Sequence, residues 1–316
     1  MKRILVTGGA GFLGTRVTSL LADSPQVDLV VSGDLRDSEV PGVVSIRVDV
    51  TESEGLADVL RLHRIDTVVH LAAIANPGRD ASMEYRVDVQ GTANVLAACV
   101  EADVHRIVVS SSGAAYGYHP DSPDWIDETD PLRGNDEFPS SRHKRLIEEM
   151  LAGARAAHPD LEQVVFRIGT ILGPTVRNQV TALWDAKRIL HIAGSDSRFV
   201  FVWVDDVAAA ILRAALGEGP AGIYNLAGDG ALSVPEIALR LGKPLLTVPA
   251  PALAVALAVG SLLRLTEHGP ERIRLLRYRP VLRNDRLKAE FGYVPARTSM
   301  QAFEEYVRTH PEVVRA

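Results

Sequence analysis

Short apolar runs alternate with longer amphipathic segments through the first half of the chain. The runs TVVHL at 67–71 and RIVVS at 106–110 lack regular polar alternation, which is typical of parallel strands covered on both faces. Between such runs, apolar residues recur at helical spacing. The pattern predicts strands at 3–7, 28–32, 43–48, 67–71, 106–110 and 163–168, and helices at 14–22, 53–62, 85–101 and 140–157. This alternation predicts an α/β fold built on a doubly wound parallel sheet.

The second half of the chain is less regular. It predicts a strand at 199–204, a helix at 205–216 and a strand at 222–226, so we expect residues 199–227 to return to the first sheet. The predicted organisation is a larger N-terminal domain at 1–172 and a smaller C-terminal substrate lobe made of 173–198 and 228–316. Residues 121–139, rich in Pro and Asp, predict a long loop, and such loops often carry function.

Composition and charge narrow the function classes. The chain has 47% hydrophobic and 23% charged residues, as ordinary globular enzymes do, and its net charge of -6 gives no general attraction to nucleic acid or to an anionic membrane. Cys99, the single cysteine, lies in an apolar helical pattern and is expected in the core, so the chain is compatible with the cytoplasm. The nine histidines lack metal-ligand spacing, and no metal site is expected.

One long apolar run stands out in the second half. It covers residues 252–263 and follows Pro249 and Pro251. A membrane-spanning helix needs about twenty residues, so this run is too short to cross a bilayer. We expect a helix that is buried or lies in an interface, and no membrane contact.

A glycine-rich loop follows the first predicted strand and opens the first predicted helix. It reads TGGAGFLG at 7–14. Gly8 and Gly11 permit a tight turn and close approach of a pyrophosphate, Gly14 lets the helix pack against the strand, and the helix N-terminus directs free N–H groups at the anion. In this strand–turn–helix context the pattern predicts a Rossmann domain that binds a nicotinamide dinucleotide.

Charged residues after the second and third strands bear on the choice of cofactor. Asp34 ends the second strand, 20 positions after Gly14, where a carboxylate accepts hydrogen bonds from the adenosine ribose and repels a 2′-phosphate. This favours NAD, although Arg36 could accommodate that phosphate, so NADP stays open. Asp49, after the third strand, could face the adenine edge or could instead cap the next turn.

Several motifs together resemble the extended short-chain dehydrogenase/reductases of the NAD-dependent epimerase/dehydratase type. They are TGGAGFLG at 7–14, DVT at 49–51, HLAA at 70–73, DVQGTANVLAAC at 88–99, SSSGAAYG at 110–117, SRHKRLIEE at 141–149, FRIGTILGP at 166–174 and FVWVDDVAAAIL at 201–212. The resemblance implies a Rossmann domain with a small C-terminal substrate lobe. It also implies a polar substrate such as a nucleotide sugar, and a homodimer that packs helices at 91–101 and 141–157.

The same resemblance implies roles for particular residues. The cofactor-binding set comprises Gly8, Gly11, Phe12, Leu13, Gly14, Asp34, Arg36, Asp49, Val50, Leu71, Ala72, Ala73 and Lys144. Ser112 is the serine that hydrogen-bonds the reacting oxygen. Asn94 lies on a helix that supports the active site. In this family a Tyr-x-x-x-Lys pair completes the site: the tyrosine is the general acid or base, and the lysine lowers its pKa and holds the nicotinamide ribose.

The chain departs from the family at that pair. Lys144 matches the lysine, but four residues earlier stands Ser140 in place of the tyrosine. Residues four apart share a helix face, so the position is right and the chemistry is different. A neighbouring cation can pull the pKa of a phenol, about 10, towards neutrality, whereas a serine needs its own base.

Three interpretations follow from this departure. The chain is an enzyme with a substitute acid or base, for which His143, Tyr116 and Tyr118 are candidates. Alternatively, the proton passes through Ser140, a water and Lys144, or comes from the substrate. In the third interpretation catalysis is lost, and the chain binds a dinucleotide to regulate or scaffold.

Basic residues of the second half are candidates for substrate contacts. Arg167, Arg177 and Arg198 could bind an acidic or phosphorylated substrate, because arginine suits bidentate phosphate contacts. Eight basic residues lie between 264 and 288 with acidic ones interleaved. We expect a solvated helical face there, with a phosphate-facing cluster as the alternative and no nucleic-acid partner.

Overall fold

Seven parallel strands form the central sheet of the computed structural model, which describes residues 1–74, 80–263 and 269–314. Their order across the sheet is β11-β6-β5-β4-β1-β2-β3, so the chain starts in the middle and winds outwards in both directions. The strands are β1 (Lys2–Thr7), β2 (Val27–Asp34), β3 (Val44–Arg47), β4 (Thr67–His70), β5 (Arg106–Ser112), β6 (Glu162–Ile168) and β11 (Gly222–Leu226). The doubly wound α/β sheet expected from the sequence is confirmed.

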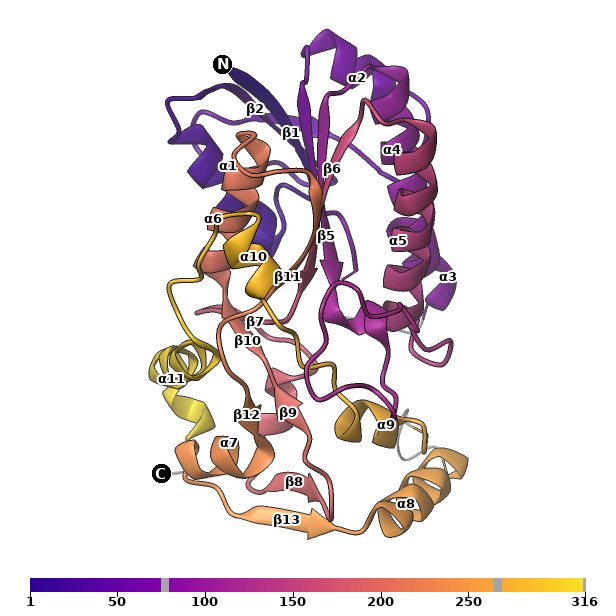
Figure 1. Ribbon diagram of the computed structural model, residues 1–316, viewed down its shortest axis with the longest axis vertical. Coiled ribbons are helices and arrows are strands. Elements are labelled where there is room, and N and C mark those ends of the chain that lie inside the picture. Colours follow the sequence, from indigo (N-terminus) through magenta and orange to yellow (C-terminus); the bar gives the residue numbers. More distant parts are fainter. Residues whose placement is uncertain (75–79, 264–268, 315–316) are drawn as a thin grey trace.

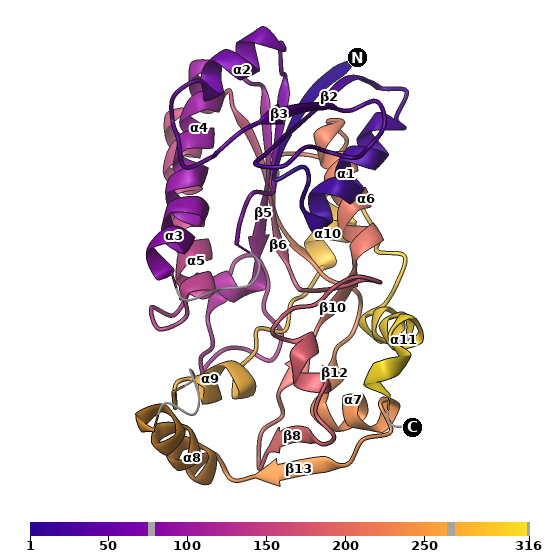
Figure 2. The same ribbon diagram turned by 180° about the vertical axis from the view of Figure 1, so that it is seen from behind.

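Helices cover both faces of this sheet (Figures 1 and 2). On one face lie α1 (Phe12–Ala22), α6 (Val204–Ala215) and α10 (Asp285–Ala289); on the other lie α2 (Leu56–Leu62), α4 (Gly91–Glu101) and α5 (Pro139–Ala157). Each helix layer buries its apolar side against the sheet, giving two cores that contain Ile4, Val69 and Phe166 on one face and Leu5, Val68 and Leu151 on the other. Cys99 is buried in the second core, as expected.

The predicted helix at 85–101 is built from three pieces. They are α3 (Ala81–Tyr85), the π-helix η1 (Arg86–Gln90) and α4. A π-helical turn inserts one extra residue per turn, and such turns often occur at functional sites. Here the turn carries Asp88 into the interior, where its carboxylate accepts a hydrogen bond from the Ile74 N–H at 2.9 Å.

Residues 199–227 divide between the two parts of the molecule. β11 pairs with β6 in the central sheet, and α6 packs against α1. The predicted strand at 199–204 does not join this sheet, which corrects the expectation. It is split into β9 (Arg198–Phe199) and β10 (Phe201–Trp203), and β10 pairs with β7 (Thr170–Leu172) in a separate ladder. The first sheet is already closed on that side by β11, so β10 cannot lie beside β6.

The remaining elements form the smaller lobe at the carboxyl ends of the strands (Figure 1). They are β8 (Ile189–Ile192), β12 (Leu232–Ser233), β13 (Leu245–Val248), α7 (Val234–Arg240), α8 (Ala250–Leu262), α9 (Arg272–Arg277) and α11 (Ser299–Thr309), with short 3-10 helices η3 (Thr181–Trp184) and η4 (Pro311–Val313). A further 3-10 helix, η2 (Gly113–Tyr116), follows β5 and packs against α5. The core of the smaller lobe is aromatic: Trp184 packs edge-on against Phe303, with ring centroids 5.0 Å apart. The domain boundaries drawn from the sequence stay a prediction.

Two further features of the described ranges bear on the site. The long loop after η2 pairs with the C-terminal segment, because Ile126 N–H donates to Val281 O and Arg283 N–H to Ile126 O, both at 2.8 Å. This pairing brings residues 279–282 to the carboxyl edge of the sheet. In addition, none of the described helices has both the length and the apolar character needed to cross a bilayer.

Candidate active site

A cleft of about 590 Å³ lies between the carboxyl ends of the strands and the smaller lobe. This is the edge at which doubly wound sheets bind ligands, and the volume suits a small-molecule site. Its lining includes Gly8, Gly11, Phe12, Leu13, Gly14, Leu71, Ala73, Ile74, Ser112, Tyr118, Ser140, Lys144, Arg177, Arg198, Phe199 and Arg279. Most residues predicted for cofactor and catalysis therefore meet in one cavity.

The glycine loop leaves no room for side chains at two positions. A Cβ on Gly14 would lie 2.0 Å from Gly8 O, and one on Gly8 would lie 2.8 Å from Ala72 N. Gly8 also has a φ of +70°, which favours glycine. α1 begins at Phe12 without a side-chain cap on Gly11, so its first N–H groups are open to an anion. This cradle fits a dinucleotide diphosphate.

Asp34 and Arg36 lie beside that cradle. Asp34 accepts hydrogen bonds from the N–H groups of Ala10, at 3.1 Å, and of Arg36, at 3.2 Å, while the Arg36 guanidinium donates to Ala10 O at 3.0 Å. The carboxylate therefore stands at the end of β2 next to the glycine loop, where an adenosine ribose bound along the loop would reach it.

Asp49 and Val50 occupy less direct positions. The Asp49 carboxylate accepts hydrogen bonds from the side-chain hydroxyl of Thr51 at 2.7 Å and from its N–H at 2.9 Å, and both bonds lower the pKa of Asp49. This is the turn-capping arrangement that the sequence left open. Val50 is buried against Gly91, and Val50 O accepts a hydrogen bond from the Asn94 amide at 2.9 Å. Adenine contacts for these two residues stay a prediction.

Lys144 and two serines face the cleft from β5 and α5. The Lys144 ammonium donates to Ser110 O at 2.8 Å, which aims the side chain along the end of β5. Burial lowers the pKa of Lys144, against the opposing effect of Asp88 and Glu148. Ser112 Oγ accepts from the Ala114 N–H at 3.1 Å, so it caps η2 and also lines the cleft. Ser140 is exposed in the first turn of α5, one turn before Lys144.

His143 lies outside the cleft lining. Its imidazole is buried, hydrogen-bonds through Nδ1 to the Asp88 carboxylate at 2.9 Å and packs edge-on against Tyr85. It thereby ties α5 to the π-helical turn, whose Asp88 also holds the Ile74 N–H. His143 therefore contacts Asp88 and Tyr85 and does not line the cleft, and its role in proton transfer stays a prediction.

Tyr116 and Arg167 also lie outside the cleft lining, in a buried polar network. Arg167 forms a salt bridge with Glu148 at 2.7 Å and donates to the Tyr116 hydroxyl at 2.8 Å. That hydroxyl donates to Asn225 Oδ1 at 2.9 Å, and burial raises the pKa of Tyr116. Tyr116 and Arg167 therefore bind protein groups and do not line the cleft, and the ligand roles suggested for them stay predictions. No local sequence signal distinguishes a buried arginine from one that binds substrate.

The opposite end of the cleft is cationic. Arg177 and Arg198 line it, as the sequence suggested, and Arg279 joins them. The Arg279 guanidinium stacks on the Phe199 ring, 4.3 Å from its centroid, and its Nε and one terminal nitrogen are buried without a hydrogen-bond partner among the described residues. Burial lowers the pKa of Arg279 to about 10, so it stays charged at neutral pH. The expected solvated face therefore does not hold for Arg279.

Tyr118 is the phenol that does line the cleft. Its ring packs edge-on against Phe138, and its hydroxyl makes no hydrogen bond to the described residues. Burial raises the pKa of Tyr118, while the charge of Arg279 acts in the opposite direction. The sequence named Tyr118 as one candidate among several, and the structure singles it out by position.

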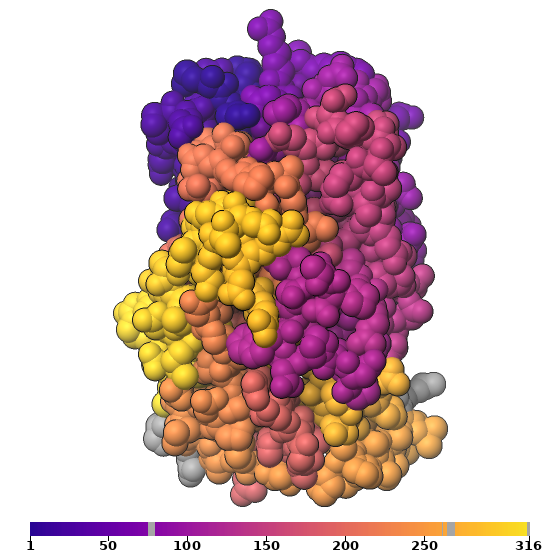
Figure 3. Space-filling model, in the orientation of Figure 1, coloured from indigo at the N-terminus to yellow at the C-terminus, as the bar shows by residue number. Residues whose placement is uncertain are grey.

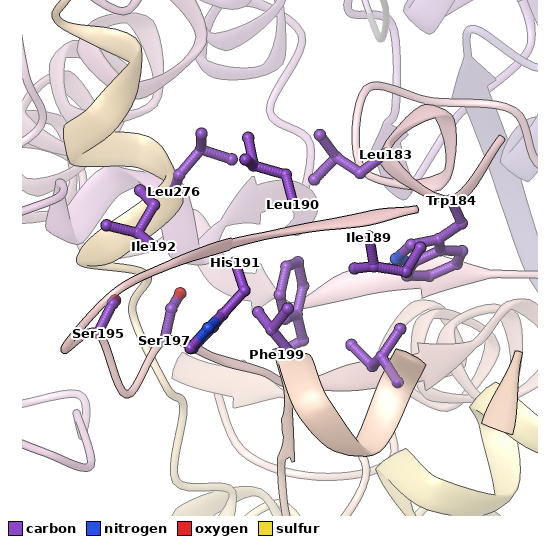
Figure 4. A pocket seen from close by; sticks show the side chains of 12 residues that line it. Leu183, Trp184, Ile189, Leu190, His191, Ile192, Ser195, Ser197, Phe199 and Leu276 are labelled. Carbon is purple, nitrogen blue, oxygen red and sulfur yellow. The ribbon is translucent and has the colours of Figure 1, made fainter. Parts of the chain in front are cut away.

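A second, narrow and mostly apolar pocket lies in the smaller lobe (Figure 4). Phe199 lines both cavities, and Ile192 and Leu276 lie along the narrow one. Its volume is about 30 Å³, enough for about one water-sized group. The pocket therefore borders the cleft at Phe199 and is too small for a sugar or a nucleotide.

His70 ends β4 directly before the residues that line the cleft. Its Nδ1 lies 2.7 Å from Thr7 Oγ1, and its Nε2 lies 3.0 Å from Thr92 Oγ1. The Thr92 hydroxyl donates to Asp88 O, so it accepts from Nε2, and the imidazole is the neutral Nε2–H tautomer. Burial lowers the pKa of His70 to about 3.

Replacing His70 with glutamine should flatten the acid dependence of stability. The folded chain keeps His70 neutral, while the unfolded chain protonates it below about pH 6.5. The contribution of His70 is therefore complete above that pH and is lost as the pH falls towards 3. The stability of the native chain should fall, relative to the variant, by about 1.4 kcal/mol per pH unit in this window. Urea unfolding at several pH values measures it. His158→Gln, an exposed control, should keep the native slope, and parallel curves for His70→Gln would contradict the assignment.

Comparison with known proteins gives consistent results. Residues 4–227 match the family described as "NAD dependent epimerase/dehydratase family". An uncharacterized protein from Mycobacterium tuberculosis is 29% identical over 97% of this chain and 84% of its own length. A UDP-glucose 4-epimerase from Azospirillum brasilense is 34% identical over 54% of this chain and 49% of its own length.

Solved structures share the whole fold. The UDP-glucose 4-epimerase from Thermus thermophilus, in complex with NAD, is 26% identical with a TM-score of 0.71, covering 97% of this chain and 99% of that one. The UDP-glucose 4-epimerase from Thermotoga maritima, with UDP-glucose, is 21% identical with a TM-score of 0.75, covering 98% and 99%. The family match spans most of the chain and includes the glycine cradle. This chain therefore belongs to the NAD dependent epimerase/dehydratase family.

Proposed function

We propose that this chain is an NAD-dependent epimerase or dehydratase, or a related reductase, that acts on a nucleotide sugar. The proposal depends on one observation above all: a single cleft is lined by a diphosphate cradle, by Ser112 and the half-buried Lys144, which donates to Ser110 O, and by Arg279, which has no ion-pair partner among the described residues. The first feature suits the cofactor, the second suits proton handling at a hydroxyl or carbonyl group, and the third suits a second anionic ligand.

The cofactor we assign is NAD. When bound, NAD supplies a hydride acceptor and donor for a carbinol or carbonyl carbon. The chain's own contribution is the glycine cradle for the diphosphate and the Asp34 carboxylate for the ribose hydroxyls. Relatives of known structure, such as the Thermus thermophilus enzyme, were crystallised with NAD, which supports this assignment.

Replacing Asp34 with asparagine should weaken NAD binding and reduce the preference over NADP. Loss of charge-assisted hydrogen bonds to the ribose should raise the Kd for NAD by about 10- to 100-fold. The Kd for NADP should rise less or fall, because repulsion of its 2′-phosphate disappears while Arg36 remains beside the loop. Calorimetric titration measures both constants. Asp37→Asn, an exposed control in the same loop, should bind like the native chain. An equal change for both cofactors would contradict the role of Asp34.

We assign the cationic end of the cleft to binding the nucleoside diphosphate group of the substrate. Phe199 links Arg198 and Arg279. It follows Arg198 in β9, and the Arg279 guanidinium stacks on its ring. Asp196 pairs with Arg198, whereas Arg279 has no ion-pair partner among the described residues. A cationic group held in place without its own counter-ion is preorganised for an anion. The UDP-sugar ligands of structural relatives fit this charge.

Replacing Arg279 with methionine should weaken UDP binding by about 10- to 100-fold, because one charged hydrogen-bonding group contributes about 1.5–3 kcal/mol. UDP is the probe, and calorimetry in the presence of NAD is the measurement, so the result does not depend on turnover. Arg283→Met is the matched control, because Arg283 is exposed in the same segment. Native affinity in Arg279→Met, or no UDP binding by the native chain, would refute the assignment of this end.

Proton handling is assigned to residues around Lys144. Ser112 orients the reacting oxygen, and Lys144 holds the cofactor ribose and supplies positive charge to the site. Ser140 cannot act as the missing phenol, so the acid or base is Tyr118, the phenol that faces the cleft, or a water between Ser140 and Lys144. Tyr116 and His143 are not carried forward because they face away from the cleft.

Turnover with UDP-sugars decides between this function and a catalytically silent one. The chain, saturated with NAD, is incubated with UDP-glucose and related UDP-sugars, and products are identified by NMR together with reduced-nicotinamide absorbance. Conversion supports an enzyme. Binding of NAD and UDP without conversion supports a regulatory or scaffold protein, the alternative favoured by Ser140 in place of tyrosine.

A further inference from the structure

Exposed apolar side chains are concentrated at the outer end of the smaller lobe. Of the fifteen large hydrophobic side chains found exposed among the described residues, seven lie between 239 and 263. They are Leu239, Leu245, Leu246, Val255, Val259, Leu262 and Leu263. Apolar side chains that are exposed together in one part of a fold are typical of an interaction surface, whereas single exposed ones are ordinary.

The helix α8 is the centre of this surface. It has no charged residue, and a helix that is apolar on all sides is normally buried. Here Val255 is 64% exposed and Leu262 is 82% exposed. Of the two alternatives expected from the sequence, the buried helix does not hold and the helix that lies in an interface stays a prediction. In the described ranges α8 packs against α9, and β13, which leads into it, pairs with β8 and leaves Leu245 and Leu246 exposed. Together β13 and α8 form the lower edge of the molecule in Figures 1 and 3.

The surroundings of this edge are basic, although the whole chain is acidic with a net charge of -6. Between 237 and 263 the only charged residues are Arg240 and Lys243. Lys187 and Arg188 are exposed directly before β8, the partner strand of β13. On the other side α9 carries Arg272, Arg274 and Arg277.

Acidic groups near this edge are fewer than the basic ones, and two of them are paired. Glu137 pairs with Arg274 at 3.1 Å, and Glu304 pairs with Arg240 at 3.7 Å. The others are Glu271 at the start of α9 and the exposed Asp185 and Glu236. The edge therefore combines exposed apolar side chains with a basic border, a charge pattern opposite to that of the chain as a whole.

We propose that β13 and α8 dock this chain on the surface of an anionic lipid bilayer. The apolar side chains of α8 enter the boundary between headgroups and acyl chains, and the basic border contacts anionic headgroups. The helix has 13 residues, about 20 Å at 1.5 Å per residue, which is shorter than the roughly 30 Å hydrocarbon core. It therefore lies in the interface and does not cross the membrane.

A second copy of the chain fits this surface less well. A two-fold dimer presents the same patch from both subunits, so the basic border of one copy would meet the basic border of the other. Such like-charge contact opposes association, whereas an anionic lipid surface complements both the apolar centre and the basic border.

Vesicle flotation of the full chain tests the proposal. The vesicles are phosphatidylcholine alone, or phosphatidylcholine with an equal amount of phosphatidylglycerol. The native chain should float with the anionic vesicles, and added salt should weaken the binding. The double variant Val255→Glu/Val259→Glu should bind at least about tenfold more weakly, because it places charge in the apolar contact. The double variant Lys187→Glu/Arg188→Glu should also weaken binding to the anionic vesicles, and it should not change binding to phosphatidylcholine vesicles. Val294→Glu, at another exposed apolar site, is the control and should bind like the native chain.

Unchanged NAD-induced thermal stabilisation shows that each variant is folded. Failure of the native chain to float with the anionic vesicles overturns the proposal. The proposal is also overturned if the native chain binds both vesicle types equally and the Lys187→Glu/Arg188→Glu variant binds them as the native chain does. A dimer in light scattering that Val255→Glu/Val259→Glu dissociates, without vesicle binding, assigns the surface to a second copy.

Discussion

Replacing Lys144 with methionine is expected to lower turnover by about 10²- to 10⁴-fold, the usual contribution of a positioned proton-transfer group. The near-isosteric change removes the positive charge that α5 places against the end of β5, where Lys144 donates to Ser110 O at 2.8 Å. Because Lys144 also holds the cofactor ribose in our proposal, the Kd for NAD should rise by about tenfold. Stopped assays with a UDP-sugar and calorimetric titration of NAD provide the two measurements.

The matched control for Lys144 is Arg142→Met. Arg142 is a basic residue on the same helix, exposed to solvent and 3.9 Å from Asp136, so its loss should leave turnover and NAD affinity unchanged. Affinity for UDP should stay native in both variants because the cationic end of the cleft is intact. Native turnover in Lys144→Met would remove Lys144 from the mechanism and leave Tyr118 or the substrate to handle the proton.

Replacing Glu148 with alanine is expected to destabilise the fold by about 3–5 kcal/mol, as breaking one side of a buried ion pair does. Its carboxylate pairs with Arg167, and both side chains are at most 5% exposed. Ser111 Oγ also donates to Glu148 Oε1, and Arg167 in turn donates to the Tyr116 hydroxyl. Without Glu148 the guanidinium would stay buried with no counter-ion. Urea unfolding followed by circular dichroism measures the loss.

Two comparisons make this second test specific. Glu149→Ala removes the adjacent, exposed carboxylate, which pairs with Arg145 across one helical turn, and should cost no more than about 0.5 kcal/mol. The double variant Glu148→Leu/Arg167→Met removes both charges and should recover much of the lost stability. Equal losses of unfolding free energy for Glu148→Ala and Glu149→Ala would show that the buried ion pair stabilises the fold no more than the exposed one.

Local patterns predicted the first domain well, because they depend on neighbours along the chain. The apolar runs at β4 and β5 and the glycine loop before α1 lie where they were expected. The prediction of secondary structure was less accurate where contacts between distant segments decide the pairing of a strand or the form of a helix. The strand expected at 199–204 is split, since β10 pairs with β7 and not with the central sheet. The helix expected at 85–101 contains a π-helical turn because Asp88 is drawn inwards to Ile74 and His143.

The candidate site shows the same division. Gly8, Gly14 and Lys144 follow from motifs whose spacing directly determines geometry. The roles of the arginines do not follow from motifs in the sequence. The sequence made Arg167 a candidate for substrate binding and put Arg279 in a solvated face, yet Glu148 neutralises Arg167 in the core, and Arg279 lies on Phe199 at the cleft without a counter-ion among the described residues. Each of these contacts joins residues far apart in the chain.

The amino-acid sequence alone determined the strand–helix alternation, the dinucleotide loop, the position of Lys144 and the absence of a tyrosine at 140. These depend on periodicity, on backbone freedom at glycine and on spacing within one helix. Only the tertiary structure decided which polar groups face the cleft, which of them neutralise one another in the core, and that α8 is exposed. Burial and pairing are set by contacts between distant segments, and those contacts determine whether a charged or apolar side chain is available to a ligand or a surface.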